Sequence, residues 1–219
     1  MNSSMNNVTI AGVDGCRAGW IVATRAGIDI VDRLDAVVAR QHVVGIDMPI
    51  GLPPRWGRSA DNEARAALGT RRSTIFDTLP RPLLDQPTHS AANALSRRLF
   101  DRGISVQSWN LAPKVREVDA LMNPDLETRI AEIHPECAFV LMAGRPLVSK
   151  HTADGVEERS RLLADRFDLP KTTPLGAARH DLLDAYAVLW SAERFATGRY
   201  RSFGQGERDE RGLLMRIVA

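Results

Sequence analysis

The chain has few of the features that mark a specialised class of protein. Only two of its 219 residues are cysteines, Cys16 and Cys137, and they form no CxxC pair. A disulfide framework and a zinc-finger spacing are therefore both excluded, and we expect the protein in the reducing cytoplasm. The formal net charge is only +2. Bulk charge thus gives no reason to expect nucleic-acid binding, and any basic surface must be local.

Long hydrophobic runs are also missing. None approaches the length needed to span a bilayer, so we expect no membrane partner. Residues 1–7 lack the basic and apolar regions of a signal peptide, and we predict that they are disordered. A content of 44% hydrophobic and 26% charged residues is typical of a globular protein. No repeat or change in composition marks a boundary, which favours one domain over residues 1–219. A homodimer is one assembly that the sequence allows.

Apolar segments in the first fifty residues predict the beginning of an α/β sheet. The predicted strands cover residues 8–14, 20–24, 28–31 and 43–47. The first two are separated by a glycine-containing turn and therefore read as a hairpin. The fourth is apolar on both faces, as expected of a strand in the middle of a sheet covered by helices. The first and the fourth strand each end in an aspartate, Asp14 and Asp47.

Most of the remaining chain is predicted to be helical. Helices are expected over 34–40, 59–68, 88–102, 109–122, 155–167 and 180–198, with a helical insertion at about 55–125. The other segments are predicted to be an ordered loop or insertion (70–87), a strand (129–134), a short helix or loop (135–141), a mobile polar segment (198–212) and an edge strand (213–218). One α/β domain with a helical insertion accounts for this order.

The last predicted helix carries two carboxylates in an otherwise apolar sequence. Asp181 and Asp184 are three residues apart and therefore share a face of the helix. Asp181 lies in the first turn, where a carboxylate also stabilises the helix electrostatically. Asp184 lies one turn further on, where a carboxylate is rarely buried without a partner. That partner is expected to be either an arginine or a metal ion.

Asp14 and Asp47 at the ends of two strands suggest a common site with this helix. Carboxyl ends of neighbouring strands meet at one sheet edge, where open α/β sheets place their sites. Carboxylate oxygens without His or Cys ligands suit Mg²⁺ or Mn²⁺, and two such ions can hydrolyse a phosphodiester. For Asp14 alone, an Asx-turn before Gly15 explains the residue equally well.

Longer motifs give the chain a family resemblance. Residues 12–20 (GVDGCRAGW), 45–53 (GIDMPIGLP), 113–119 (PKVREVD) and 132–136 (EIHPE) resemble the DUF429 family of predicted ribonuclease H-like nucleases. The closing helix is similar to that of RuvC-type resolvases. The resemblance implies a ribonuclease H-like mixed sheet, with an antiparallel opening hairpin followed by parallel strands, and a metal set of Asp14, Asp47 and Asp184 joined by Asp181. No Glu occupies the first helix as in ribonuclease H; Asp35 there is expected to be a cap.

Further charged residues are candidates around this site. Glu132 and His134 share a face of their strand, so that they and Glu136 could extend the site or line a substrate cleft. Alternatively, the segment is a structural bend with Glu136 as a helix cap. We include Glu136 among the catalytic candidates and His134 among the substrate-binding ones. The candidates to contact an anionic substrate are Arg17, Arg71, Arg72, Lys114, Arg116 and Lys150. Each of these, taken alone, is equally compatible with a solvated charge or an ion pair.

The sequence predicts a Mg²⁺- or Mn²⁺-dependent nuclease acting on DNA or RNA through a two-metal carboxylate site. Two alternatives stay open. An actin- or sugar-kinase-like phosphotransferase would need a second glycine-rich phosphate loop, and only the one at 14–17 is visible. A non-catalytic module could retain the fold and bind a partner or a small anion.

Overall fold

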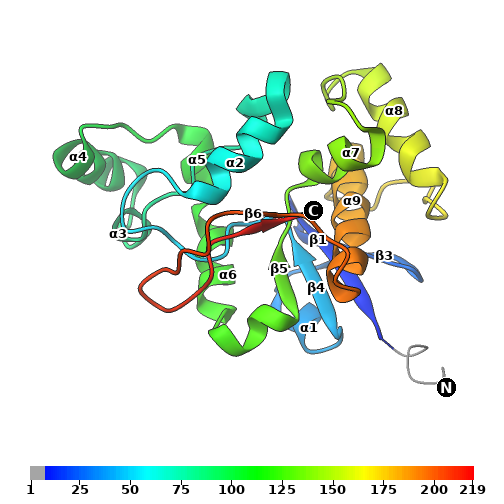
Figure 1. The fold of residues 1–219 in the computed structure, drawn as a ribbon, viewed down its shortest axis with the longest axis horizontal. Coiled ribbons are helices and arrows are strands. Elements are labelled where there is room, and N and C mark those ends of the chain that lie inside the picture. The colour runs from blue at the N-terminus through cyan, green and yellow to red at the C-terminus, as the bar shows by residue number, and fades with distance from the viewer. Residues whose placement is uncertain (1–7) are drawn as a thin grey trace.

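The computed structural model describes residues 8–219, so the predicted disorder of residues 1–7 lies outside the described residues. A five-stranded mixed sheet forms the centre of the molecule (Figure 1). Its strands are β1 (Ile10–Cys16), β2 (Gly19–Thr24), β3 (Gly27–Val31), β4 (Val43–Ile46) and β5 (Ile130–Glu132). The order is β3-β2-β1-β4-β5. β2 is antiparallel to both of its neighbours, β1 and β3, while β4 is parallel to β1 and β5 is parallel to β4. The predicted α/β mixed sheet is confirmed, and its order is compatible with a ribonuclease H-like fold.

Helices cover both faces of the sheet because its strands are apolar on both sides. Ala11 and Val13 of β1 pack into one core, together with residues of α1 (Asp35–Val38) and α6 (Ala112–Leu121). Ile21 and Ala23 of β2 pack into a second core on the opposite face. That core is built from α7 (Pro135–Ala143), α8 (Ala153–Ala164) and α9 (Arg179–Ala196), which Figure 1 shows to the right of the insertion.

Two glycines allow α9 to lie directly on the sheet. A Cβ atom on Gly12 of β1 would stand 2.1 Å from the backbone nitrogen of Leu189 and 2.3 Å from the carbonyl oxygen of Ala185. On Gly45 of β4, a Cβ would meet Val188 Cγ1 at 2.9 Å. Any side chain at position 12 would therefore push the helix backbone away from the strand. The two glycines set the distance at which α9 crosses β1 and β4.

The segment between β4 and β5 is helical, as expected, but its boundaries differ from the predicted ones. It contains α2 (Ser59–Leu68), η1 (Gly69–Thr74), α3 (Arg81–Leu84), α4 (His89–Phe100), α5 (Val106–Asn110), α6 and η2 (Pro124–Thr128). The loop or insertion predicted over 70–87 lies in this segment and contains two short helices, because η1 follows α2 directly and Pro82 lies in the first turn of α3, where proline is favoured. The single helix predicted over 109–122 is two helices, because Pro113 has no N–H to continue the α5 ladder.

The C-terminal segment packs against the insertion and the sheet. The strand predicted over 213–218 is shortened to β7 (Ile217–Val218), which pairs with β6 (Ser202–Phe203). The polar stretch 198–212 was predicted to be mobile, yet it carries the buried Asp209. Its carboxylate accepts from the backbone N–H of Leu52 at 3.0 Å and pairs with Arg81 at 2.7 Å. These buried contacts hold the segment in place despite its polar composition.

We predict that Gly12→Ala destabilises the fold by about 3 kcal/mol, at the upper end of the range for overpacking, because the added methyl collides with backbone atoms of α9. Urea unfolding measures the change. Gly103→Ala is the matched control, since the exposed Gly103 faces the flexible end of the Arg97 side chain. Equal effects of the two substitutions would contradict the role assigned to Gly12.

Candidate active site

The sheet register brings two strand-end aspartates together. In the parallel pairing of β1 and β4, Gly12 lies opposite Gly45, and the backbone N–H of Asp47 donates to the carbonyl of Val13 at 2.9 Å. Each strand therefore contributes the same Gly-x-Asp sequence in register. Because side chains alternate along a strand, each Asp lies on the same face as its Gly, which is the face covered by α9. Asp14 and Asp47 thus lie side by side beneath α9.

Asp184 of α9 completes this carboxylate group from above the sheet. Its side chain is only 1% exposed, and Lys150 Nζ lies 2.5 Å from its Oδ2. Its Oδ1 is buried and has no hydrogen-bond partner among the described residues. The partner predicted for Asp184 was an arginine or a metal; the structure gives a lysine to one oxygen and leaves the other without a partner.

Asp181 has the helix-capping role that the sequence left open. Its Oδ2 accepts a hydrogen bond from the backbone N–H of Ala178, at 2.8 Å, and so satisfies a donor at the start of α9. Its Oδ1 lies 3.3 Å from His180 Nε2. Asp181 also lines the cavity beside Asp184. It is therefore a wall of the site whose carboxylate is engaged in holding the helix start.

The three central carboxylates repel one another in a partly dehydrated place. Burial, followed by the charges of Asp47 and Asp184, raises the pKa of Asp14 well above its ordinary value. Burial and the charge of Asp184 raise the pKa of Asp47 to about 8. The pKa of Lys150 is lowered by burial, but Asp184 outweighs this effect and brings it above its ordinary value. More negative charge is concentrated here than one ammonium group neutralises.

A cavity of about 590 Å³ opens in front of these carboxylates. Asp14, Asp47, Asp181 and Asp184 line its sheet side. Arg71 and the 48% exposed Phe76, which follow α2 in the insertion, line the opposite side. Its remaining polar lining includes Lys114, Ser73, Thr74, Ser149, His151 and His180. The cavity therefore joins an acidic floor to a rim with cationic, hydroxyl and aromatic groups.

His134 and Glu136 line this cavity but are both held in structural contacts. His134 Nδ1 accepts from the backbone N–H of Glu136 at 3.3 Å and caps α7. Burial lowers the pKa of His134 to about 4, so the imidazole is neutral at physiological pH and is a poor phosphate ligand. Glu136 Oε1 pairs with Arg159 at 2.6 Å, while its Oε2 is buried without a partner among residues 8–219. The cap predicted for Glu136 is supplied by His134 instead.

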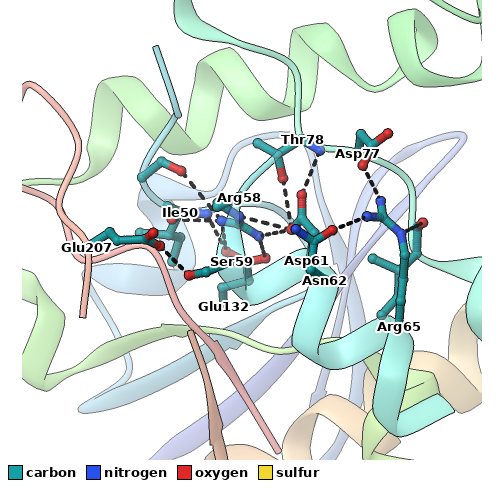
Figure 2. Close-up of polar contacts among 12 residues, drawn as sticks. Ile50, Arg58, Ser59, Asp61, Asn62, Arg65, Asp77, Thr78, Glu132 and Glu207 are labelled. Atoms are coloured by element: carbon teal, nitrogen blue, oxygen red, sulfur yellow. Dashed lines mark hydrogen bonds and ion pairs between the residues drawn. The ribbon is translucent and has the colours of Figure 1, made fainter. Parts of the chain in front are cut away.

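A buried ion-pair network forms part of the cavity lining, to which Arg58, Asp61 and Glu132 contribute; Figure 2 shows its contacts. Arg58, 2% exposed, donates to Glu132 of β5 at 2.5 Å and to Asp61 of α2 at 2.7 Å. Glu132 also accepts from the backbone N–H of Ile50 at 2.8 Å, and Asp61 from that of Thr78 at 2.9 Å. The Glu132 carboxylate is therefore paired with Arg58 and does not add to the group of Asp14, Asp47 and Asp184. The network ties α2 and the chain after β4 to the sheet edge.

The basic residues predicted at the site divide into two groups. Arg71 and Lys114 line the cavity, although Lys114 also donates to the carbonyl of Gly19 at 2.5 Å. Arg17, Arg72 and Arg116 do not line it. Arg17 is exposed at the tip of the β1–β2 hairpin, beyond the point where Asp14 turns inward. Contact of Arg17 with an anionic substrate stays a prediction.

Arg72 and Arg116 have other positions. Arg116 donates to the carbonyls of Leu84 at 2.6 Å and Gln86 at 2.9 Å and lies over the ring of Trp109, so it fastens α6 to α3. Arg72 lines a neighbouring cavity of about 500 Å³, which also contains Arg102 and shares Phe76 with the acidic one. Sequence reasoning missed Arg58 and Phe76. The only sequence signal for an exposed ring at Phe76 was an aromatic residue in a largely polar segment.

The carboxylates of Asp14, Asp47 and Asp184 suit a divalent cation by chemistry and charge, although they are not already arranged around one metal position. Among residues 8–219, no three His, Cys, Asp or Glu side chains are arranged to hold a metal ion. The buried, unpartnered Oδ1 of Asp184, together with the pKa values of Asp14 and Asp47 raised by burial and by neighbouring carboxylates, nevertheless indicates a place where negative charge lacks a counter-charge. Hard carboxylate oxygens are the ligands that Mg²⁺ and Mn²⁺ accept. Asp14, Asp47 and Asp184 are the residues that would hold such an ion.

One of the comparisons with known proteins identifies the family of the chain. The model of the family described as "Protein of unknown function (DUF429)" matches residues 12–209, and the chain belongs to this family. No curated protein and no solved structure matches the chain. Within the described residues, no helix combines the length and apolar character that a membrane crossing requires. The family assignment covers both strand-end aspartates and α9, but its description gives no activity.

The raised pKa of Asp47 predicts how metal-free stability depends on pH. A carboxyl whose pKa is near 3.8 when unfolded and about 8 when folded favours the folded state below both values. This contribution is lost as the pH rises from about 4 through about 8. Asp47→Asn removes the ionisation, so the variant should gain stability relative to the wild type as the pH rises through this window. Urea unfolding in chelator, at about pH 5 and about pH 9, measures the difference. A gap that does not change with pH would contradict the assigned pKa.

Proposed function

We propose that the protein is a divalent-cation-dependent nuclease that hydrolyses phosphodiester bonds of DNA or RNA. The observation that carries the proposal is the meeting of Asp14, Asp47 and Asp184 at the carboxyl edge of the sheet, with one Asp184 oxygen buried and unpartnered. In their ionised form these carboxylates need a cation to balance their charge, and the site opens into a cavity large enough for a nucleotide. The free, buried Cys16 and Cys137 suit the cytoplasm, where we place this activity.

The chain's own residues would divide the work between holding a cation and holding the substrate. Asp14, Asp47 and Asp184 would bind Mg²⁺ or Mn²⁺, which when bound supplies Lewis-acid activation of water and charge stabilisation at phosphorus. Asp181 would keep the first turn of α9 in place through its hydrogen bond to Ala178. Arg71, on the opposite cavity wall, would contact a phosphate of the substrate.

The insertion supplies surfaces suited to nucleotides that flank the reacting phosphate. Phe76 lies between the acidic cavity and the neighbouring one, and its ring is 48% exposed. The neighbouring cavity carries Arg65, Arg72 and Arg102 against a single acidic residue, Asp77. An exposed aromatic ring beside clustered arginines is a combination that binds single-stranded nucleic acid by stacking and backbone contacts. The low net charge of the chain is compatible with such a local basic surface.

Asp14→Asn should lower Mn²⁺-dependent cleavage by at least about 100-fold, because a metal ligand at the reacting centre contributes several kcal/mol to the barrier. The measurement is the cleavage rate of labelled single-stranded, duplex, hybrid and branched oligonucleotides. Asp165→Asn, an exposed carboxylate at the end of α8, is the matched control and should retain the wild-type rate. Inactivity of the metal-replete wild type on every substrate would refute the proposed function.

Phe76→Ala should weaken substrate binding roughly 10-fold with a much smaller change in kcat, because stacking of one base contributes about 1–3 kcal/mol. Steady-state kinetics separates KM from kcat, and Phe76→Trp should preserve binding. Leu99→Ala removes an equally exposed apolar side chain from α4 and should leave KM unchanged. Unaltered KM in Phe76→Ala would place the substrate elsewhere.

A further inference from the structure

Lys150 reaches the carboxylates from a well-defined turn between α7 and α8. Thr152 donates to the carbonyl of Ser149 from its backbone at 3.0 Å and from its hydroxyl at 2.8 Å, and the same hydroxyl caps α8 by accepting from Gly155 N–H at 3.1 Å. A Cβ on Gly155 would stand 2.0 Å from the Ser149 carbonyl oxygen, so the turn packs tightly on the helix start. The backbone that carries Lys150 is therefore fixed.

The Lys150 ammonium lies where a cation would be expected. Its Nζ is 2.5 Å from Asp184 Oδ2, within the cavity that Asp14 and Asp47 line. Three carboxylates and one ammonium therefore share the floor of the cavity. The second oxygen of Asp184 is buried without a partner among the described residues. One oxygen of Asp184 thus holds a protein cation, while the other has no partner among the described residues to offset its charge.

We infer that Lys150 permanently occupies one cation position of the carboxylate site, so that the chain binds at most one divalent ion beside it. This inference rests on the proposed function. It replaces the two-metal site predicted from the sequence by a site with one divalent ion and one ammonium group. An ammonium group resembles a metal ion in neutralising carboxylate charge at short range. It has no vacant coordination position for water, so activation of water would remain with the single divalent ion.

The alternative is that Lys150 and Asp184 form an ion pair that only stabilises the fold. Both accounts expect Lys150→Gln to be less stable without metal, because Asp184 would keep a buried charge with no partner. Only the cation-position account expects Mn²⁺ to replace the lost ammonium. Metal binding to the variant therefore separates the two explanations without reference to catalysis.

The experiment counts bound Mn²⁺ by the electron paramagnetic resonance signal of the free aqueous ion. Wild type, Lys150→Gln and Lys150→Arg are titrated under identical conditions, with thermal unfolding measured in chelator and in Mn²⁺. We expect one ion per chain in the wild type and in Lys150→Arg, and two in Lys150→Gln. The Tm of Lys150→Gln should fall by roughly 5 °C in chelator and be restored by Mn²⁺ to a greater extent than that of the wild type.

The outcomes distinguish this inference from the proposed function. No ion in the wild type and one in Lys150→Gln would support the cation position of Lys150 while contradicting metal-dependent catalysis. Equal ion counts in the wild type and Lys150→Gln would overturn the inference, and cleavage by the wild type would then decide the proposed function separately. Two ions in the wild type would also overturn it. Lys150→Arg shows whether positive charge at this position is what sets the count.

Discussion

The close packing of α9 on β1 and β4 is the constraint on which the rest of the structure depends. Gly12 and Gly45 lie opposite each other in the parallel ladder, and a side chain at Gly12 would collide with the helix backbone. This approach places Asp184 directly over the strand ends that carry Asp14 and Asp47. A helix held further out by a larger residue would separate the carboxylates. The same close packing of α9 on β1 and β4 therefore determines both the core and the geometry of the site.

The packing of α9 on the sheet brings buried carboxylates close together, and their repulsion costs electrostatic free energy. Surrounding contacts offset part of this cost. Burial and mutual repulsion raise the pKa values of Asp14 and Asp47, and Lys150 offsets part of the charge. The nearby carboxylates of Glu132 and Glu136 are engaged instead by Arg58 and Arg159. Carboxylates with dedicated arginine partners serve the architecture. Those that share a single ammonium retain the capacity to bind a cation, which is why we assign the chemistry to them.

The parts of this arrangement that depend on short-range patterns were predictable from the sequence. Apolar strands ending in Asp14 and Asp47 and an apolar helix carrying Asp184 predict that the three meet, because strand polarity and helix periodicity fix where each side chain lies. The partners of those side chains were not predictable. Lys150 reaches Asp184, and Arg58 reaches Glu132, from segments distant in sequence, and no local pattern encodes either pairing.

The central claim is that Asp14, Asp47 and Asp184 form one divalent-cation site with Lys150 at its side. The most direct measurement is the anomalous scattering of a crystal soaked in Mn²⁺. The account predicts a single peak bonded to oxygens of all three aspartates, including Asp184 Oδ1, with the Lys150 ammonium still on Oδ2. Absence of a peak at saturating Mn²⁺, or a peak bonded to other residues alone, would contradict it.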